Sequence, residues 1–149
     1  MRASSNRKVP TVLIADNDED ERRLLKAVLK LKGFKVVEAA HGQEAIDLAT
    51  CSTPDLLLID LRLPRVSGPV VIRQITNQAH LRNMAMVAVS ISADNARRSM
   101  RGLAIHLEKP VELYQLDSLI DRLFPMLIRH HQPIELKMRK EWNRESASH

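Results

Sequence analysis

The sequence LLLIDLRLP at residues 56–64 decides the fold of this chain. Four consecutive apolar residues ahead of a proline-containing loop are typical of a strand that is buried on both faces of a parallel sheet. The strand ends in Asp60, which puts a carboxylate at the carboxyl edge of the sheet, where open α/β folds bind their ligands. A second apolar run, at residues 12–15, is followed by the sequence DND at residues 16–18. The two runs together predict an acidic pocket at one edge of the sheet.

Strand-like and helix-like segments alternate along the rest of the chain. Short apolar runs indicate strands, apolar residues at intervals of three and four indicate helices, and Gly33 stands where the first helix is expected to end. This strict alternation predicts a doubly wound α/β fold, in which right-handed crossovers join five parallel strands and helices cover both faces of the sheet. The expected strands are residues 12–15, 34–37, 56–59, 84–89 and 104–107, and the expected helices are residues 19–32, 43–50, 70–77, 94–101 and 113–130.

The composition is typical of one globular domain. A length of 149 residues is enough for a single hydrophobic core. No apolar run approaches the roughly 18 residues that a membrane-spanning helix needs, and residues 1–10 lack the apolar region of a secretory signal, so we expect a cytoplasmic protein. The single cysteine, Cys51, excludes an internal disulfide, and we expect its thiol to be buried and inert.

The net charge of +5 raises the question of nucleic-acid binding. The basic residues are scattered along the chain, however, which is typical of a solvated surface rather than of a binding patch. Aromatic residues, which stack on unpaired bases, make up only 3% of the chain. We therefore expect neither nucleic acid nor a membrane among the partners of this protein.

The two ends of the chain differ in character from its middle. Residues 1–9 form a basic tail, residues 10–130 carry the alternating pattern, and residues 131–149 form an extension that is too short for an effector domain. Apolar side chains recur at every fourth residue of this extension, which predicts a C-terminal helical tail whose stripe is buried against this chain or a second copy. A homodimer is therefore left open, beside the alternative of a disordered extension. The stripe consists of Ile134, Met138 and Trp142.

Residues 10–124 resemble the receiver domain of bacterial two-component response regulators, in its stand-alone, single-domain form. The resemblance lies in polar residues that follow the expected strands in the order found in that family. It implies a flavodoxin-like sheet with the strand order 2-1-3-4-5. The matching residues are Asp16-Asn17 as the acidic pair, Asp60 with Leu63-Pro64 and Gly68 as the phosphoacceptor strand and its loop, Ser90 as the hydroxyl residue, and Lys109-Pro110 after the fifth strand.

The resemblance assigns a role to each of these residues. It implies that Asp60 accepts a phosphoryl group as an aspartyl phosphate, and that Lys109 and Ser90 bind phosphoryl oxygens and offset their charge. Ser92 is close enough in sequence to compete with Ser90 for the hydroxyl role. It further implies a bound Mg²⁺ ion and a candidate cis peptide bond before Pro110. The metal ligands that it implies are Asp16, Asn17, Asp60 and the backbone carbonyl of Arg62.

Three features depart from the usual pattern of the family. Asn17 stands where a metal-binding acid is usual, and because its amide oxygen carries no charge we expect weak Mg²⁺ binding, unless Asp18 supplies the missing carboxylate. His106 stands where an aromatic residue often changes position on phosphorylation, so Ser90 and His106 are the expected switch residues. The segment from Ser90 to Lys109 is also shorter than usual.

These observations predict a signalling switch rather than an enzyme. A histidine kinase or a phosphotransfer protein would donate a phosphoryl group to Asp60, and an output protein that the sequence does not identify would bind the result. The departures at Asn17 and His106 favour an alternative, a pseudo-receiver that binds its partners without phosphorylation. Mg²⁺-dependent phosphorylation by a small phosphodonor would distinguish the two functions.

Overall fold

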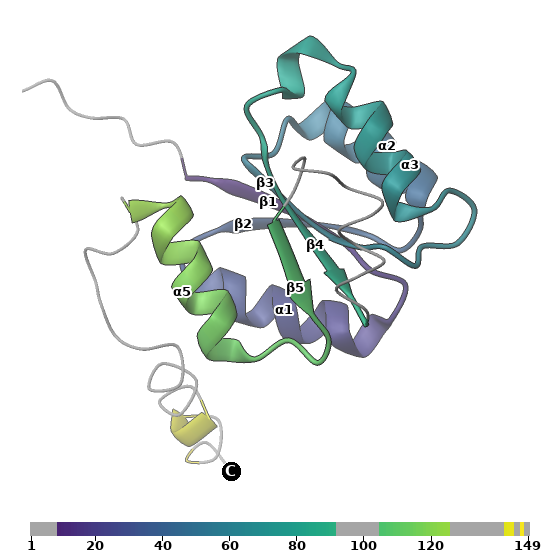
Figure 1. Cartoon of the computed structure of the whole chain (residues 1–149). Helices are drawn as coiled ribbons and strands as arrows, with labels where there is room; N and C mark the ends of the chain where they lie inside the picture. Colours follow the sequence, from purple (N-terminus) through teal and green to yellow (C-terminus); the bar gives the residue numbers. More distant parts are fainter. Residues whose placement is uncertain (1–8, 92–104, 126–141, 145–146, 148–149) are drawn as a thin grey trace, which may run out of the picture.

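The computed structural model describes residues 9–91, 105–125, 142–144 and 147. They include a five-stranded sheet in the order β2-β1-β3-β4-β5, in which every pair of neighbouring strands is parallel (Figure 1). The doubly wound sheet predicted from the sequence is therefore confirmed. Its strands are β1 (Thr11–Ala15), β2 (Lys35–Ala39), β3 (Leu56–Asp60), β4 (Ala85–Ser90) and β5 (Ile105–Glu108).

The helices lie close to the predicted segments, and a short 3₁₀ helix that was not predicted precedes β4. The helix expected at residues 94–101 lies outside the described residues. Gly33 follows the end of α1 with a φ of 102°, a conformation that favours glycine. The described helices are α1 (Glu19–Leu31), α2 (Gly42–Ser52), α3 (Gly68–Thr76), η1 (Ala79–Leu81) and α5 (Leu113–Leu123).

The last helix is shorter than the sequence pattern predicts. α5 ends at Leu123, and its C-cap Phe124 has left the helical region, with φ −130° and ψ 67°. Phe124 precedes Pro125, and a residue before proline is driven out of the α conformation by a steric clash with the proline ring. The prediction of a helix that continues to residue 130 overlooked this stop, and residues 126–130 lie outside the described part of the chain.

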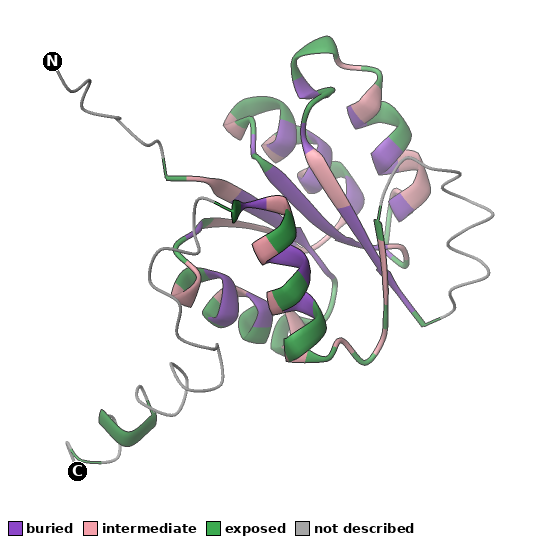
Figure 2. Cartoon of the chain, turned by 60° about the vertical axis from the view of Figure 1, so that its left-hand side comes forward, coloured by how far each residue is buried: buried purple, intermediate pink, exposed green. Residues whose placement is uncertain are grey.

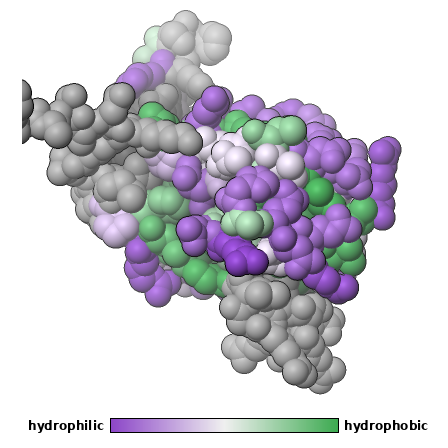
Figure 3. Space-filling view, turned by 90° about the horizontal axis from the view of Figure 1, so that it is seen from above, coloured by the Kyte–Doolittle hydropathy of each residue, from purple (hydrophilic) through white to green (hydrophobic). Residues whose placement is uncertain are grey.

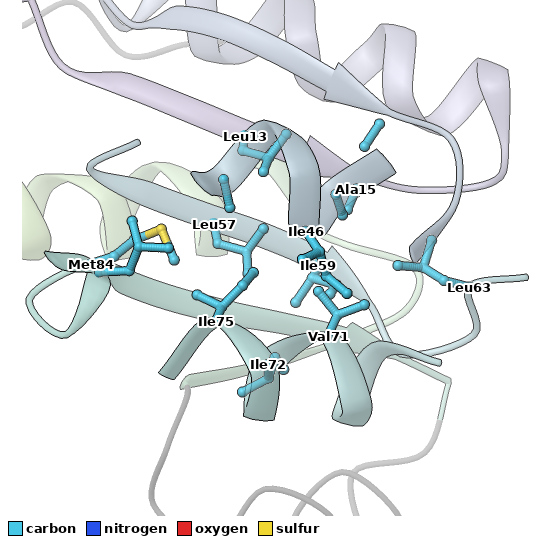
Figure 4. Close-up of a cluster of buried hydrophobic side chains, with 14 of the residues drawn as sticks. Leu13, Ala15, Ile46, Leu57, Ile59, Leu63, Val71, Ile72, Ile75 and Met84 are labelled. Carbon is cyan, nitrogen blue, oxygen red and sulfur yellow. The ribbon is translucent and has the colours of Figure 1, made fainter. Parts of the chain in front are cut away.

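Helices cover both faces of the sheet, α2 and α3 on one side and α1 and α5 on the other (Figure 1). Buried residues run along the central strands and the inward sides of the helices, while the outer helix faces are exposed (Figure 2). All five residues of β3 are buried, as expected for a central strand between two helical layers. The core between the sheet and α2–α3 is drawn in Figure 4 and includes Leu13, Ile46, Leu57, Ile59, Val71, Ile72 and Ile75.

The opposite core fixes α5 against α1 at the far end of the sheet. The rings of Phe34 and Phe124 meet edge to face, with centroids 5.1 Å apart and planes at 87°. Nearby, the largely buried ammonium group of Lys32 donates to the carboxylates of both Asp117 and Asp121 on α5. These contacts hold α5, and with it the loop that leads from β5, at a fixed place beside the sheet.

The expectation that Cys51 is buried is wrong, because its side chain is exposed. The buried positions of α2 include Ala45, Ile46 and Ala49, which follow the three-to-four residue spacing of one helix face. Cys51 comes two residues after Ala49, and a step of two turns a helical side chain by about 200°, to the other face. A burial estimate based on residue type alone missed this change of face.

The described surface is mixed in polarity. Figure 3 shows hydrophilic side chains interspersed with smaller apolar areas on one face of the molecule. Among the described residues, no helix is both long enough and apolar enough to cross a membrane. Trp142 lies in a helical turn and is 70% exposed. Its side chain is therefore not buried against this domain, which was one of the two arrangements predicted for the apolar stripe of the C-terminal extension. Ile134 and Met138 lie outside the described residues.

The first turn of α2 packs directly on the loop that follows β3. The backbone N–H of Gly42 donates to the carbonyl oxygen of Pro64 at 3.2 Å. A Cβ atom at position 42 would lie 2.0 Å from the carbonyl oxygen of Val66, a distance that no real side chain adopts. Glycine is therefore required here by the close approach of two backbones.

Gly42→Ala should lower the free energy of unfolding by about 1–3 kcal/mol, because the added methyl group forces the loop at residues 64–66 away from α2. Urea denaturation followed by circular dichroism measures this change. Gln43→Ala, at an exposed position in the same turn, is the control and should alter stability by less than about 0.5 kcal/mol. Equal stability of the two variants would contradict the predicted clash.

Candidate functional site

Two buried aspartates lie side by side at the carboxyl edge of the sheet. Asp60 is the last residue of β3, and Asp16 directly follows β1. Ala15 and Ile59 are partners in the register of these two strands, so the residues that follow them emerge next to each other. Asp16 is only 3% exposed and Asp60 only 8% exposed. The acidic pocket predicted from the two apolar runs is therefore present.

The loop after β3 holds the carboxylate of Asp60 in place. The backbone N–H of Arg62 donates to Oδ1 of Asp60 at 2.8 Å. Leu61 donates through its backbone N–H to Val89 on β4, and its own carbonyl accepts from the N–H of Gly68, both at 3.1 Å. A Cβ atom at Gly68 would lie 2.8 Å from the carbonyl oxygen of Asp60, so glycine lets the start of α3 close over this loop.

Lys109 supplies the positive charge of the pocket. It follows β5, its backbone N–H donates to the carbonyl of Ser90 at 2.8 Å, and the Lys109–Pro110 peptide bond is cis. Its Nζ atom lies 2.7 Å from Oδ2 of Asp60, 2.6 Å from Oε2 of Glu21 and 3.8 Å from Oδ2 of Asp16. Burial lowers the pKa of Lys109, but the hydrogen bonds to Asp60 and Glu21 outweigh it and raise the pKa above its usual range. Lys109 is therefore a permanent cation.

Hydrogen bonds to its side chain and to its backbone hold Asp16. Its Oδ1 accepts from the backbone N–H of Asp18 at 2.8 Å, and its carbonyl oxygen accepts from the guanidinium group of Arg22. Burial raises the pKa of Asp16 to about 6, although the hydrogen bond from Asp18 and the charge of Lys109 act in the opposite direction. The carboxylate is thus ionised at neutral pH and becomes protonated under mildly acidic conditions.

Asn17 and Asp18 directly follow Asp16 in the chain. Asn17 is exposed. The carboxylate of Asp18 is the N-cap of α1 and accepts from the N–H groups of Asp20 and Glu21, at 2.9 and 3.0 Å. Asp18 therefore acts as a helix cap in this structure and does not supply the carboxylate that Asn17 lacks.

Glu21 brings a third carboxylate to the pocket, one that the sequence analysis missed. Carboxylate oxygens of Asp16, Glu21 and Asp60 all lie within 4.8 Å of one another. Glu21 stands in the first turn of α1, and the side chain of Glu21 is 45% exposed. The signal in the sequence was its place, five residues after Asp16 and one turn into the helix that starts beside the pocket.

The remaining predicted residues are arranged around this centre. Ser90 ends β4 and is buried, and its strand neighbour Val89 is the register partner of Asp60. His106 lies within β5, half-buried and opposite Ala88. It alternates along the strand with Leu107, which packs on the α1–α5 core, so His106 points to the other face of the sheet. Most of the segment from Ser90 to Lys109, which was expected to be shorter than usual, lies outside the described residues.

Asp16→Asn should stabilise the metal-free protein at about pH 7 by about 1–3 kcal/mol. The pKa of Asp16 is about 6 in the folded protein against an ordinary 3.8, so the folded state binds this proton more tightly, and stability falls as pH rises from about 4 to 6. Urea denaturation with a chelator, at several pH values, measures the effect. The gain should vanish below about pH 4, where Asp16 is protonated in both states, and Asp47→Asn, on an exposed carboxylate, should show no such trend. A gain independent of pH would contradict this explanation.

Comparison with known proteins connects this pocket to a family. Residues 12–121 match the response regulator receiver domain. The chain is 30% identical to the polar-differentiation response regulator DivK of Brucella anthropi over 106 aligned residues. These residues cover 69% of this chain and 86% of that protein. The corresponding protein of Brucella ovis shows the same identity and coverage.

Solved structures agree in fold. The chemotaxis response regulator CheY4 of Vibrio cholerae is 19% identical with a TM-score of 0.72, over 78% of this chain and 99% of that one. The receiver domain of a sensor histidine kinase from Pseudomonas aeruginosa, solved with a magnesium ion coordinated in its active-site cleft, is 24% identical with a TM-score of 0.72, over 79% and 99% of the two chains. The family match spans most of the sequence and includes the three clustered carboxylates and Lys109. This chain therefore belongs to the response regulator receiver domains of two-component systems.

Proposed function

We propose that this protein is a phosphorylation-controlled switch in which Asp60 accepts a phosphoryl group from a histidine kinase or a phosphotransfer protein. The observation that carries the proposal is the position of the Asp60 carboxylate, buried at the edge of the sheet and 2.7 Å from the ammonium group of Lys109. A carboxylate oxygen is a competent nucleophile for phosphoryl transfer. A fixed cation beside it offsets the negative charge of the incoming group.

In the proposed reaction an oxygen of Asp60 attacks the phosphorus of a phosphohistidine on the donor protein. The oxygen–phosphorus bond forms, the phosphorus–nitrogen bond breaks, and the imidazole nitrogen leaves with the electron pair. Lys109 remains protonated throughout and donates to a phosphoryl oxygen. The hydroxyl of Ser90, at the end of the neighbouring strand, would donate to another. Positioning and charge neutralisation account for most of the catalysis in such a transfer.

The pocket fits a Mg²⁺ ion by the chemistry of its donor atoms. Its carboxylates are the hard oxygen ligands that Mg²⁺ prefers. Asp16, Asp60 and the backbone carbonyl of Arg62 would hold the ion, with the amide of Asn17 as a weaker neighbour. When bound, Mg²⁺ supplies positive charge to the phosphoryl oxygens during transfer.

A groove beside the pocket supports a protein as the phosphoryl donor. A cavity of about 150 Å³ lies next to Asp16, Glu21 and Lys109, and its other lining residues are mainly apolar. At its rim Leu24, on α1, is 48% exposed. An apolar surface beside Lys109, which contacts the Asp60 carboxylate, suits a partner that docks while it delivers its phosphoryl group. The phosphorylated protein would then signal by contact with an output protein, with Ser90 and His106 as the proposed switch residues.

Acetyl phosphate with Mg²⁺ should add the mass of one phosphoryl group to the intact protein, as measured by mass spectrometry. Asp60→Ala should abolish the adduct, because it removes the nucleophile, while Asp47→Asn, on an exposed carboxylate of α2, should leave it unchanged. An adduct that persists in Asp60→Ala would refute the assignment of Asp60. A wild-type protein that gains no adduct, yet binds partners equally with and without phosphodonor, would instead support the pseudo-receiver.

A further inference from the structure

The side chain of Glu21 enters the acidic pocket from α1 rather than from a strand end. Its Oε2 atom lies 2.6 Å from Nζ of Lys109, and its carboxylate belongs to the cluster formed with Asp16 and Asp60. Its neighbours in the same helical turn behave differently. Glu19 is 71% exposed and pairs with Arg23, four residues further along the helix. Proximity to a helix start alone does not place a carboxylate in the pocket.

The N-terminus of α1 is capped without the carboxylate of Glu21, which leaves this side chain available to the pocket. Glu21 is the third residue of α1 after the N-cap Asp18. In a capping box, a glutamate at this position accepts from the backbone N–H of the N-cap residue. Here that N–H donates to Oδ1 of Asp16 instead, at 2.8 Å. The carboxylate of Glu21 is therefore not needed to cap the helix and turns toward Lys109.

The charge of the pocket depends on Glu21. With the three clustered carboxylates ionised and Lys109 protonated, the pocket carries two negative charges in excess, which matches one divalent cation. Without Glu21 only one would remain, because Asn17 is neutral. The carboxylate oxygens lie within 4.8 Å of one another, close to the roughly 4.2 Å between opposite oxygen ligands of Mg²⁺.

We infer that Glu21 is a metal-ligating residue of this pocket and provides the carboxylate that Asn17 does not. The inference rests on the proposed function, since it takes Mg²⁺ as the ion of the phosphoacceptor site. It reverses the expectation of weak binding that the sequence suggested, because the missing acid is supplied from the first turn of α1 rather than from the strand end. In the metal-free protein, Lys109 holds Glu21 beside Asp60 and so keeps the ligand near its site.

Thermal unfolding of the unphosphorylated full-length protein at increasing Mg²⁺ concentration tests the inference, because an ion that binds the folded state raises the Tm by mass action. Glu21→Gln should weaken the apparent Mg²⁺ affinity about tenfold. Glu19→Gln removes the same charge from the same turn and should change the affinity less than twofold. The Tm of each variant without metal shows that it is folded.

Moving the carboxylate provides the decisive comparison. The double variant Asn17→Asp with Glu21→Gln should regain the wild-type affinity, since it returns the acid to position 17. If Glu21→Gln does not fold, Asn17→Asp alone decides: a gain below about twofold supports Glu21 as the existing ligand, and a gain of about tenfold overturns it. An unchanged affinity in Glu21→Gln also overturns it and leaves Glu21 as a partner of Lys109 only.

The same samples separate this inference from the proposed function. Phosphorylation of Asp60 with a Mg²⁺ affinity that does not depend on Glu21 refutes the inference and retains the function. Mg²⁺ binding that depends on Glu21 without any phosphoryl adduct refutes the function and retains the ligand. A wild-type protein whose Tm does not respond to Mg²⁺ and that gains no phosphoryl adduct refutes both.

Discussion

The ammonium group of Lys109 is the interaction on which the functional end of this domain depends. Asp16 and Asp60 are both almost fully buried and emerge from neighbouring strands, so their carboxylates would repel each other without a cation between them. Removing one partner from a buried ion pair typically costs about 3–5 kcal/mol, because the other charge stays buried and uncompensated. Lys109 is delivered by β5, at the edge of the sheet, and α5 fixes the loop that follows it. The contacts of α5 with Lys32 and Phe34, at the opposite end of the sheet, therefore contribute to a site that they do not touch.

The architecture was predictable because its signals are long and periodic. The apolar run of β3, at residues 56–59, requires a helical layer on each side, and strict alternation then leaves few possible topologies. Asp16 and Asp60 could be assigned to one pocket because the carboxyl ends of parallel strands meet at one edge of the sheet, and the family resemblance added Ser90 and Lys109. Each of these residues stands at the end of a strand or directly after it, and the parallel register of the strands brings them to the same edge of the sheet.

The features that the sequence did not reveal depend on side-chain direction. Glu21 is not used as a capping residue because Asp16 accepts the N–H of Asp18, a hydrogen bond that residue spacing does not reveal. Asp18 has the right chemistry for a metal ligand, but its backbone makes it a helix cap. Cys51 is exposed because two residues separate it from the last buried position of its helix. Each case depends on the direction in which a side chain points, which residue type does not specify.

The close contact between Gly42 and Val66 limits how the loop after β3 can move. On one side of Asp60, the loop after β3 lies against the backbone of α2 with no side chain between them, so no rotamer change can take up a displacement there. Any movement of that loop toward α2 must carry the whole helix with it. On the other side, Asp60 borders β4, which ends in Ser90, and β5 with His106 lies one strand further out. A shift of the loop after β3 is therefore transmitted directly to α2, without an intervening side chain that could absorb it.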